Sequence, residues 1–228
     1  MPGPPARPTI IFDIDGTLVD TNYLHTMAWR QAMLEHDRDV PTWRIHRMLG
    51  ASSSLLMKEL LGNEDPAIQE RWKELFDGVA DQVRAIPGAA ELLRRLTSLG
   101  AQVVLASSSP GELVDGHLRA LGADDAIAHV TSDADVEEAK PSPEVFQVAM
   151  DKAGADPTSC LVIGDATWDV ESARRAGLRT VGVLSGGYGR AELTDAGAIA
   201  VYDDVAQLLA ELDRSPLGPL LDPDAARA

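Results

Sequence analysis

The sequence contains only one cysteine, Cys160, among its 228 residues. No intrachain disulfide can therefore form, which is typical of proteins kept in a reducing compartment. The N-terminus also lacks an apolar segment of the kind that directs secretion. Together these absences predict a cytoplasmic protein. Because Cys160 opens a short apolar run, we expect it to be a small buried hydrophobic residue and not a nucleophile.

Basic residues are also scarce. The chain has 20 Lys and Arg against 36 Asp and Glu, for a formal charge of −16. Nucleic acids and anionic membranes bind basic surfaces, so we expect neither as a partner. No apolar run approaches the length of a membrane span. The hydrophobic content of 45% and charged content of 25% are ordinary for a globular protein.

Short apolar runs alternate with helix-length segments along most of the chain. We expect strands at residues 9–12, 102–106, 126–130, 160–163, 180–184 and 198–202. Helices are expected at residues 89–99, 112–121, 143–153, 168–176, 188–196 and 205–213. This alternation predicts an α/β fold with a doubly wound parallel sheet and helices on both of its faces.

Residues 22–86 break this alternation, because they show amphipathic helical stripes and no strand. We therefore predict an α/β core formed by residues 9–21 and 87–213, with a small α-helical cap inserted at residues 22–86. An insertion directly after the first strand is placed to act as a lid over the active edge of the sheet. Residues 1–8 and 214–228 are rich in Pro and Gly and are expected to be flexible tails.

Two aspartates, Asp13 and Asp15, follow the first expected strand, and Gly16 then turns the chain. In open α/β sheets, ligands bind in the crevice beyond the carboxyl ends of the strands. Two acids placed one residue apart at that edge repel each other unless a cation lies between them, and a divalent metal with oxygen ligands is the simplest solution. The alternative is an ordinary acidic turn, since Asp and Gly are common turn residues.

Other expected strand ends carry a matching set of groups. The strand at 102–106 is followed by Ser107 and Ser108, whose hydroxyl and N–H groups could hold phosphate oxygens. Lys140 precedes a helix, and Asp165 and Asp169 follow another strand at a spacing of one helical turn. Each group also has a purely structural explanation. The serines could belong to a solvated loop, Lys140 could be a surface lysine, and Asp165 could cap the helix that follows it. All of them fall at the ligand-binding edge of the sheet, so the combination favours the functional interpretation.

This ordered set resembles the haloacid dehalogenase-like hydrolase superfamily. The resemblance covers residues 10–213, and the helical insertion is similar to the small α-helical cap of that family. The nearest branch is the group of phosphoglycolate phosphatases and β-phosphoglucomutases. The motifs that carry the resemblance are Asp13-Ile14-Asp15-Gly16-Thr17, then Ser107, then Lys140-Pro141, then Gly164-Asp165 to Asp169.

The resemblance implies a role for each of these residues. Asp13 would attack phosphorus to form an aspartyl-phosphate, and Asp15 would act as general acid and base. The cofactor would be Mg²⁺, held by Asp13, the main-chain carbonyl of Asp15, and Asp165. The phosphoryl group would be bound by Ser107, Ser108 and Lys140, whereas Asp169 and Thr17 would support the ligands from behind. In the cap, the resemblance and the position in the chain point to His25, Gly50, Ser52 and Ser53 as residues near the substrate.

The expected activity is Mg²⁺-dependent hydrolysis of a small phosphate monoester, such as phosphoglycolate or a sugar phosphate. Dehalogenases of the superfamily lack the second aspartate, which is present here as Asp15. Phosphonate-cleaving relatives need a cap lysine where this chain has a run of serines. Mutases usually carry an arginine near the position of Ser53, so a β-phosphoglucomutase-like mutase is the alternative, with Arg47 or Lys58 as possible substitutes.

Two further classes of protein, a signalling domain and a non-catalytic relative, share part of this pattern. A phospho-accepting signalling domain also combines acids, a hydroxyl and a lysine on a parallel sheet, but it lacks the Asp-x-Asp-Gly-Thr motif and a cap. A non-catalytic relative would have lost Asp13 or Asp15, and both are present. The expected partner is therefore a small-molecule substrate. The sequence is compatible with either a monomer or a homodimer.

Overall fold

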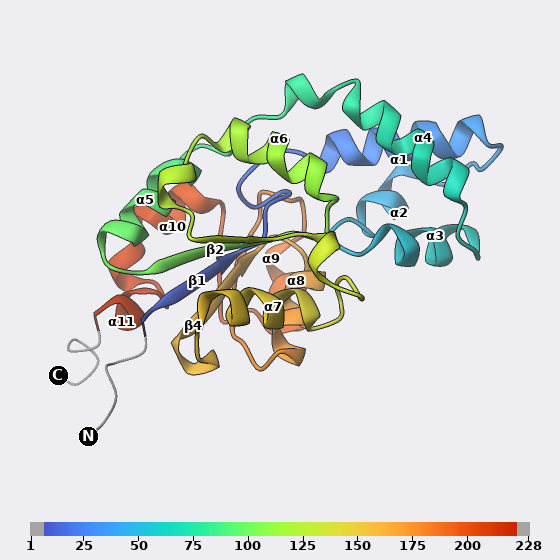
Figure 1. The fold of residues 1–228 in the computed structure, drawn as a ribbon. Coiled ribbons are helices and arrows are strands. Elements are labelled where there is room, and N and C mark those ends of the chain that lie inside the picture. The colour runs from blue at the N-terminus through green and yellow to red at the C-terminus, as the bar shows by residue number, and fades with distance from the viewer. Residues whose placement is uncertain (1–6, 223–228) are drawn as a thin grey trace.

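The computed structural model describes residues 7–222, and its centre is a six-stranded sheet in which every pair of neighbouring strands is parallel (Figure 1). The strand order is β3-β2-β1-β4-β5-β6. The order reverses beside β1, as in a doubly wound sheet. The predicted fold class is thus confirmed. The strands are β1 (Thr9–Phe12), β2 (Gln102–Ala106), β3 (His129–Thr131), β4 (Cys160–Gly164), β5 (Thr180–Val183) and β6 (Ala200–Tyr202).

Strand β1 lies in the middle of the sheet. Thr9 pairs with Gln102 on one side and with Cys160 on the other, so β1 is hydrogen-bonded along both edges. All four residues of β1 are buried, because helices cover both faces of the sheet. Cys160 is buried as expected, and burial raises the pKa of its thiol to about 11.

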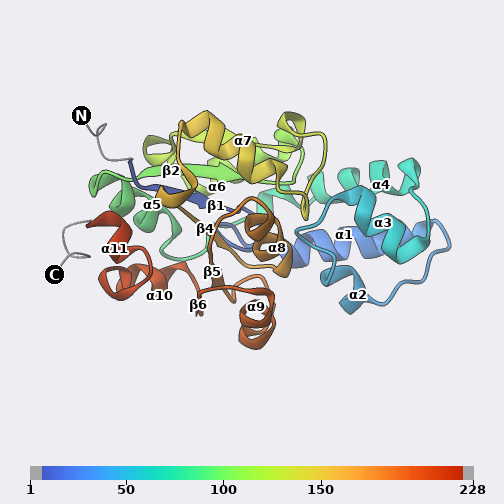
Figure 2. The same ribbon diagram turned by 90° about the horizontal axis from the view of Figure 1, so that it is seen from below.

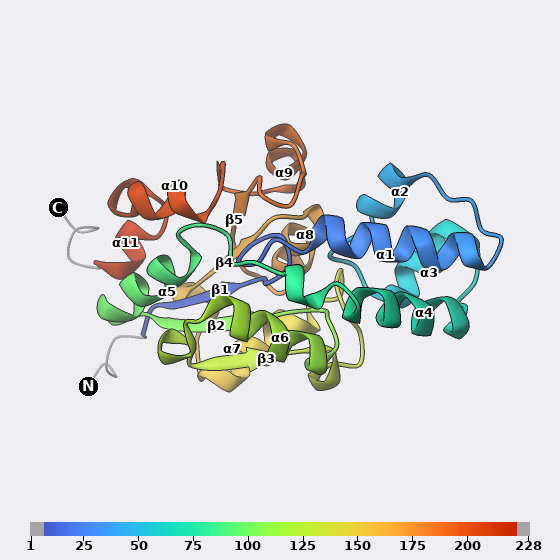
Figure 3. The same ribbon diagram turned by 90° about the horizontal axis from the view of Figure 1, so that it is seen from above.

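Helices pack on both faces, and alternate residues of β1 contact opposite layers. Ile10 and Phe12 belong to the core under α5, α6 and α10, whereas Ile11 belongs to the core under α7 and α8. Figure 2 shows the second layer, with α9 beside α8, and Figure 3 shows the first. The helices are α5 (Ala89–Ser98), α6 (Gly111–Leu121), α7 (Glu144–Ala153), α8 (Thr167–Arg175), α9 (Arg190–Ala196) and α10 (Val205–Ala210).

Residues 22–86 form a helical segment beyond the carboxyl end of β1 (Figures 1 and 3). The stacked rings of Trp29 in α1 and Trp72 in α4, with centroids 4.7 Å apart, hold these two helices together. Asp65 caps α4 by accepting the Ala67 N–H, and Pro66 occupies the first turn. The segment contains α1 (Asn22–Glu35), α2 (Thr42–His46), α3 (Ser53–Leu61), α4 (Pro66–Asp77) and a 3₁₀ turn at Ala80–Gln82.

The observed secondary structure differs from the prediction in two places. The strand expected at 126–130 begins only at His129, because residues 124–126 close a 3₁₀ turn through the Ala126 N–H and the Ala123 carbonyl. The tail expected from residue 214 continues as an ordered segment to Asp222, with α11 at Gly218–Leu221. Leu217 is buried, and its N–H donates to the Ser215 hydroxyl. These two contacts explain why the segment is ordered.

The remaining 3₁₀ turns are at Asp133–Asp135, Pro157–Ser159 and Leu212–Arg214. The rest of the expected tails, residues 1–6 and 223–228, lies outside the described residues. Within residues 7–222, every helix is too short or too polar to cross a bilayer.

Candidate active site

The carboxyl ends of β1, β2 and β4 meet below the helical segment, and each delivers polar groups to that edge. Asp13 directly follows β1, and its N–H donates to the Ile163 carbonyl of β4 at 2.9 Å. Gly16 then turns the chain with a φ of +77°. A Cβ at this position would lie 2.3 Å from the amide nitrogen of Asn22, so only glycine fits this turn.

Lys140 lies beneath Asp13 and is almost wholly buried, with 1% of its surface exposed. Its ammonium donates to Oδ1 of Asp13, lies 2.8 Å from Oδ1 of Asp169, and also reaches the Ala106 carbonyl of β2. Burial alone lowers the pKa of Lys140, but the two carboxylates raise it above its ordinary value. The lysine is therefore a fixed positive charge at the centre of the site.

Asp165 follows β4 and is held from two sides. Its Oδ1 accepts from the Thr17 hydroxyl at 2.9 Å, and its Oδ2 accepts from the amide of Asn22 at 3.0 Å. Burial, followed by the charge of Asp169, raises the pKa of Asp165 to about 7 despite these hydrogen bonds. Burial also raises the pKa of Asp13 well above its ordinary value; Lys140 opposes this shift, and the neighbouring carboxylates add to it.

The donor atoms at this edge fit a magnesium ion. Carboxylate oxygens of Asp13, Asp165 and Asp169 all lie within 4.8 Å of one another. Three carboxylates around one lysine leave excess negative charge in a buried place, which a divalent cation would balance. Mg²⁺ prefers oxygen ligands of this kind and is bound through few carboxylates.

The three serines after β2 make different contacts. Ser107 is buried, and its Oγ accepts the N–H of Ser109 at 3.0 Å. Ser108 lines a cavity above Asp13, and its buried hydroxyl has no hydrogen-bond partner within residues 7–222. Ser109 lines the same cavity and donates its hydroxyl to Asp15 at 2.8 Å.

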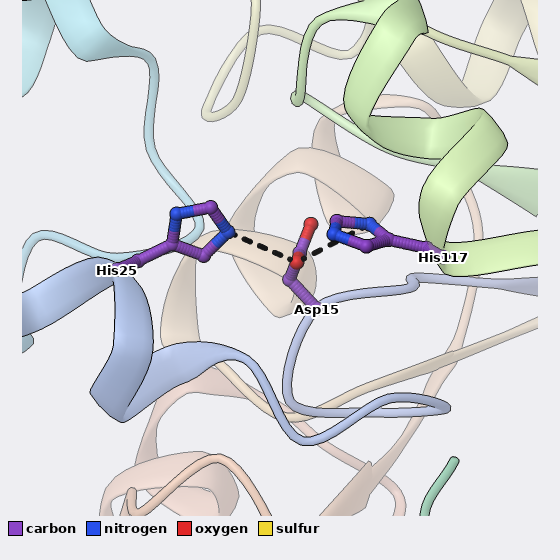
Figure 4. Close-up of side chains that lie close together, drawn as sticks. All are labelled: Asp15, His25 and His117. Carbon is purple, nitrogen blue, oxygen red and sulfur yellow. Dashed lines mark hydrogen bonds and ion pairs between the residues drawn. The ribbon is translucent and has the colours of Figure 1, made fainter. Parts of the chain in front are cut away.

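Asp15 contacts a different set of side chains from those around Lys140. Its Oδ1 accepts from the Thr21 hydroxyl at 2.6 Å and lies 3.3 Å from Nε2 of His25 and 3.6 Å from Nδ1 of His117 (Figure 4). Burial disfavours the charged carboxylate, but His117, His25 and the Thr21 hydroxyl outweigh it and lower the pKa of Asp15. Burial also lowers the pKa of His117 below its ordinary value, although the charge of Asp15 opposes this shift.

The cavity lies between the strand ends and the helical segment and has a volume of about 60 Å³. Asp13 and Asp15 form its floor. Its roof belongs to the helical segment, where Gly50, Ser53 and His25 join apolar side chains. Among the described residues, no lysine or arginine lines the cavity. The apolar part of the roof is made by Trp29, Leu49, Leu56 and Trp72.

Gly50 of the helical segment lies against the loop after β4. Its φ is +90°, and a Cβ there would lie 3.2 Å from the Cβ of Ala166. Ser52, expected near the substrate, instead caps α3 by accepting the Leu55 N–H at 3.1 Å, and it does not line the cavity. Its hydroxyl satisfies the helix end, and a contact of Ser52 with substrate stays a prediction.

Arg47 and Lys58, the two basic residues expected to serve a mutase, pair with other groups. Arg47 pairs with Glu192 at 3.0 Å and stacks on the Tyr188 ring. Lys58 pairs with Glu64 at 2.8 Å. Neither residue lines the cavity above Asp13.

Sequence reasoning missed three groups that contact the site: Asn22, Thr21 and His117. His117 carried a detectable signal, because Leu113, His117 and Leu121 recur at intervals of four residues on the buried stripe of α6. A histidine on an apolar stripe is a candidate for a specific contact. Thr21 and Asn22 carried no signal beyond their place after the acidic motif.

With the fold and this geometry established, comparisons with known proteins define the family. The sequence model of the haloacid dehalogenase-like hydrolase family matches residues 10–183, and the chain belongs to this family. The expected resemblance is thereby confirmed, and the protein is an enzyme of the hydrolase class.

Individual relatives agree with this assignment. The chain is 31% identical to a phosphoglycolate phosphatase of Rhodospirillum rubrum, over 87% of this chain and 88% of the relative. It is 26% identical to a phosphorylated carbohydrates phosphatase of Thermotoga maritima, over 89% and 98%. A hydrolase of Pseudomonas syringae of known structure superimposes with a TM-score of 0.87 at 38% identity, over 91% and 99%.

Proposed function

We propose that the protein is a Mg²⁺-dependent phosphatase that hydrolyses small phosphorylated metabolites through an aspartyl-phosphate. The observation that carries this proposal is the Asp13–Lys140–Asp169 cluster with Asp165 beside it, beneath a narrow cavity. Phosphoryl transfer needs positioning and neutralisation of charge more than any other contribution, and this cluster offers both. The relatives named as phosphatases of phosphoglycolate and of phosphorylated carbohydrates support the substrate class.

Asp13 is placed to be the nucleophile, since it lines the cavity and is oriented by Lys140. Its carboxylate oxygen forms a bond to phosphorus while the ester bond breaks, and the leaving oxygen takes a proton from Asp15. Water then attacks the phosphoryl group, gives its proton to Asp15, and releases Asp13 and inorganic phosphate. Mg²⁺, held by Asp13, Asp165 and the main-chain carbonyl of Asp15, would neutralise the phosphoryl oxygens.

Residues 22–86 serve in this proposal as a cap on a core made of residues 9–21 and 87–213. The cap supplies Ser53, Gly50 and an apolar roof, and closure over the metal edge would exclude water. No lysine or arginine of residues 7–222 lines the roof, so these residues offer no partner for a second phosphate. This feature favours a monophosphate hydrolase over a phosphosugar mutase.

A product assay tests the proposal. The enzyme is supplied with Mg²⁺ and phosphoglycolate, with small sugar phosphates, or with glucose 1-phosphate together with its 1,6-bisphosphate. We expect inorganic phosphate in each productive reaction and loss of activity with EDTA. Formation of glucose 6-phosphate without matching phosphate release would establish the mutase instead. Activity that survives EDTA unchanged would remove the metal from the proposal.

A further inference from the structure

The two imidazole rings beside Asp15 have no assigned part in this reaction. His25 lies on α1 of the cap and His117 on α6 of the core, and their rings flank the Asp15 carboxylate (Figure 4). Both histidines are buried, with 5% and 2% of their surfaces exposed. They bring two nitrogen donors and one carboxylate from three separate segments to one point.

Nε2 of His25 meets Oδ1 of Asp15 at 3.3 Å, but the protein leaves the other nitrogens of the two rings unsatisfied within its described residues. Within residues 7–222, Nδ1 of His25 and both nitrogens of His117 have no hydrogen-bond partner. Leaving a buried polar group unpaired destabilises the fold, so such groups are rare and require an explanation. Packing fixes both rings in place: His25 stacks on Phe76 with centroids 3.9 Å apart, and His117 meets Phe76 edge-on at 6.1 Å.

The distances between donor atoms are those of a metal site. Two ligands bound to Zn²⁺ with tetrahedral geometry lie about 3.4 Å from each other, given metal bonds of about 2.0–2.1 Å. Oδ1 of Asp15 lies 3.3 Å from Nε2 of His25 and 3.6 Å from Nδ1 of His117. All three donor atoms lie within 4.8 Å of one another. The hydroxyls of Thr21 and Ser109 hold the carboxylate in place, as outer partners do around zinc.

We propose that Asp15, His25 and His117 form a Zn²⁺ site distinct from the all-oxygen Mg²⁺ site, and that zinc bound there inhibits the enzyme. Imidazole nitrogens favour Zn²⁺, whereas Mg²⁺ favours carboxylate and carbonyl oxygens, so the two sites select different ions. Zinc on Asp15 would withhold that carboxylate from proton transfer. The inhibition rests on the proposed function, but the binding does not.

Calorimetric titration with Zn²⁺ in excess Mg²⁺ tests the binding without any turnover. The wild-type protein should bind one equivalent, and His117→Phe should weaken binding at least about tenfold. The change to Phe keeps an aromatic ring beside Phe76, and His117→Gln provides a second variant in case packing suffers. His36→Gln, a histidine outside the site, is the matched control and should bind zinc like the wild type. Circular dichroism and thermal melting check the fold of each variant.

The visible absorption of Co²⁺ gives a second readout, since a tetrahedral site with nitrogen ligands should colour the wild type and not the His117 variants. Inhibition by Zn²⁺, expressed relative to the zinc-free rate of each variant, should persist in excess Mg²⁺ and weaken in His117→Phe. Zinc binding that is unchanged in both His117 variants but lost in Asp165→Asn would overturn the proposal. A protein that binds zinc through His117 but hydrolyses no phosphate would refute the proposed function alone.

Discussion

The floor and the roof of the cavity differ sharply in charge. The floor, at the carboxyl edge of the sheet, is formed by Asp13 and Asp15, and Lys140, Asp165 and Asp169 lie buried behind Asp13. The roof presents tryptophan and leucine side chains with a few neutral polar groups. In the proposed mechanism the floor stabilises the transferring phosphoryl group, while the roof selects substrates by shape and apolar contact. Chemistry and selectivity belong to different parts of the chain.

The floor predicts the largest effect. Asp13→Asn should reduce turnover at least about 10⁴-fold, because an amide is a poor nucleophile. The melting temperature should hold or rise, since burial and neighbouring carboxylates already oppose the charge on Asp13. Phosphate release by the exposed control Asp20→Asn should stay close to wild type. If Asp13→Asn keeps activity within tenfold of wild type, the aspartyl-phosphate mechanism is wrong.

Asp15 belongs to the floor and contacts His25 of the roof. Asp15→Asn should have the second-largest effect on turnover, after Asp13→Asn. General acid–base assistance contributes about 10²–10⁴-fold, so kcat should fall by that factor. Substrates with good leaving groups, such as aryl phosphates, need less protonation and should lose less. A loss below this range for alkyl phosphates, measured by phosphate release, would mean that Asp15 has another role.

Lys140 tests the charge balance of the floor. Lys140→Met leaves buried carboxylates without their cation, which should cost about 3–5 kcal/mol of the free energy of unfolding. Activity should also fall about 10²–10³-fold, because a fixed charge near the phosphoryl group is lost. Lys152→Met, which breaks a more exposed pair with Asp135, is the control and should cost at most about 1 kcal/mol. Equal losses in urea denaturation would contradict a special role for Lys140.

Magnesium should stabilise the floor in a pH-dependent way. The pKa of Asp165 is raised to about 7 in the metal-free protein, so its ionisation destabilises the fold as pH rises through that value. Mg²⁺ needs the ionised form, and its apparent affinity should therefore fall about tenfold per pH unit below the pKa. The rise in melting temperature on adding Mg²⁺ should be larger near pH about 8 than near about 5.

The variant Asp165→Asn should lose most of this stabilisation, whereas the exposed control Asp195→Asn should keep it. A Mg²⁺ effect that is independent of pH, or that survives in Asp165→Asn, would place the ion elsewhere.

The smallest effect is expected from the basic residues of the cap. Arg47→Ala and Lys58→Ala should leave phosphate release within about twofold, because these side chains pair with Glu192 and Glu64 on exposed surfaces. A large loss of activity toward sugar phosphates in either variant would show that the roof acquires charge during the reaction. Steady-state kinetics with a sugar phosphate and with an aryl phosphate would separate these outcomes.

The sequence alone predicted the α/β sheet and the residues at its carboxyl edge, because the patterns that indicate them are local. A strand buried on both faces is continuously apolar, so the residues Thr9–Phe12 by themselves predict β1. Parallel strands end at a common edge, so the acids, serines and lysine that follow them could be expected to meet. The structure brings Asp13, Lys140, Asp165 and Asp169 within reach of one another.

Tertiary structure decided what depends on which surfaces face one another. The sequence could not show that Ser52 caps a helix or that Ser215 and Leu217 pack in what looked like a tail, because both outcomes depend on partners brought by folding. His117 is separated from Asp15 by 102 residues, yet the two share a buried contact because folding brings α6 against the loop that follows β1. Periodicity places a side chain on a helix face, but only packing decides which group it meets there.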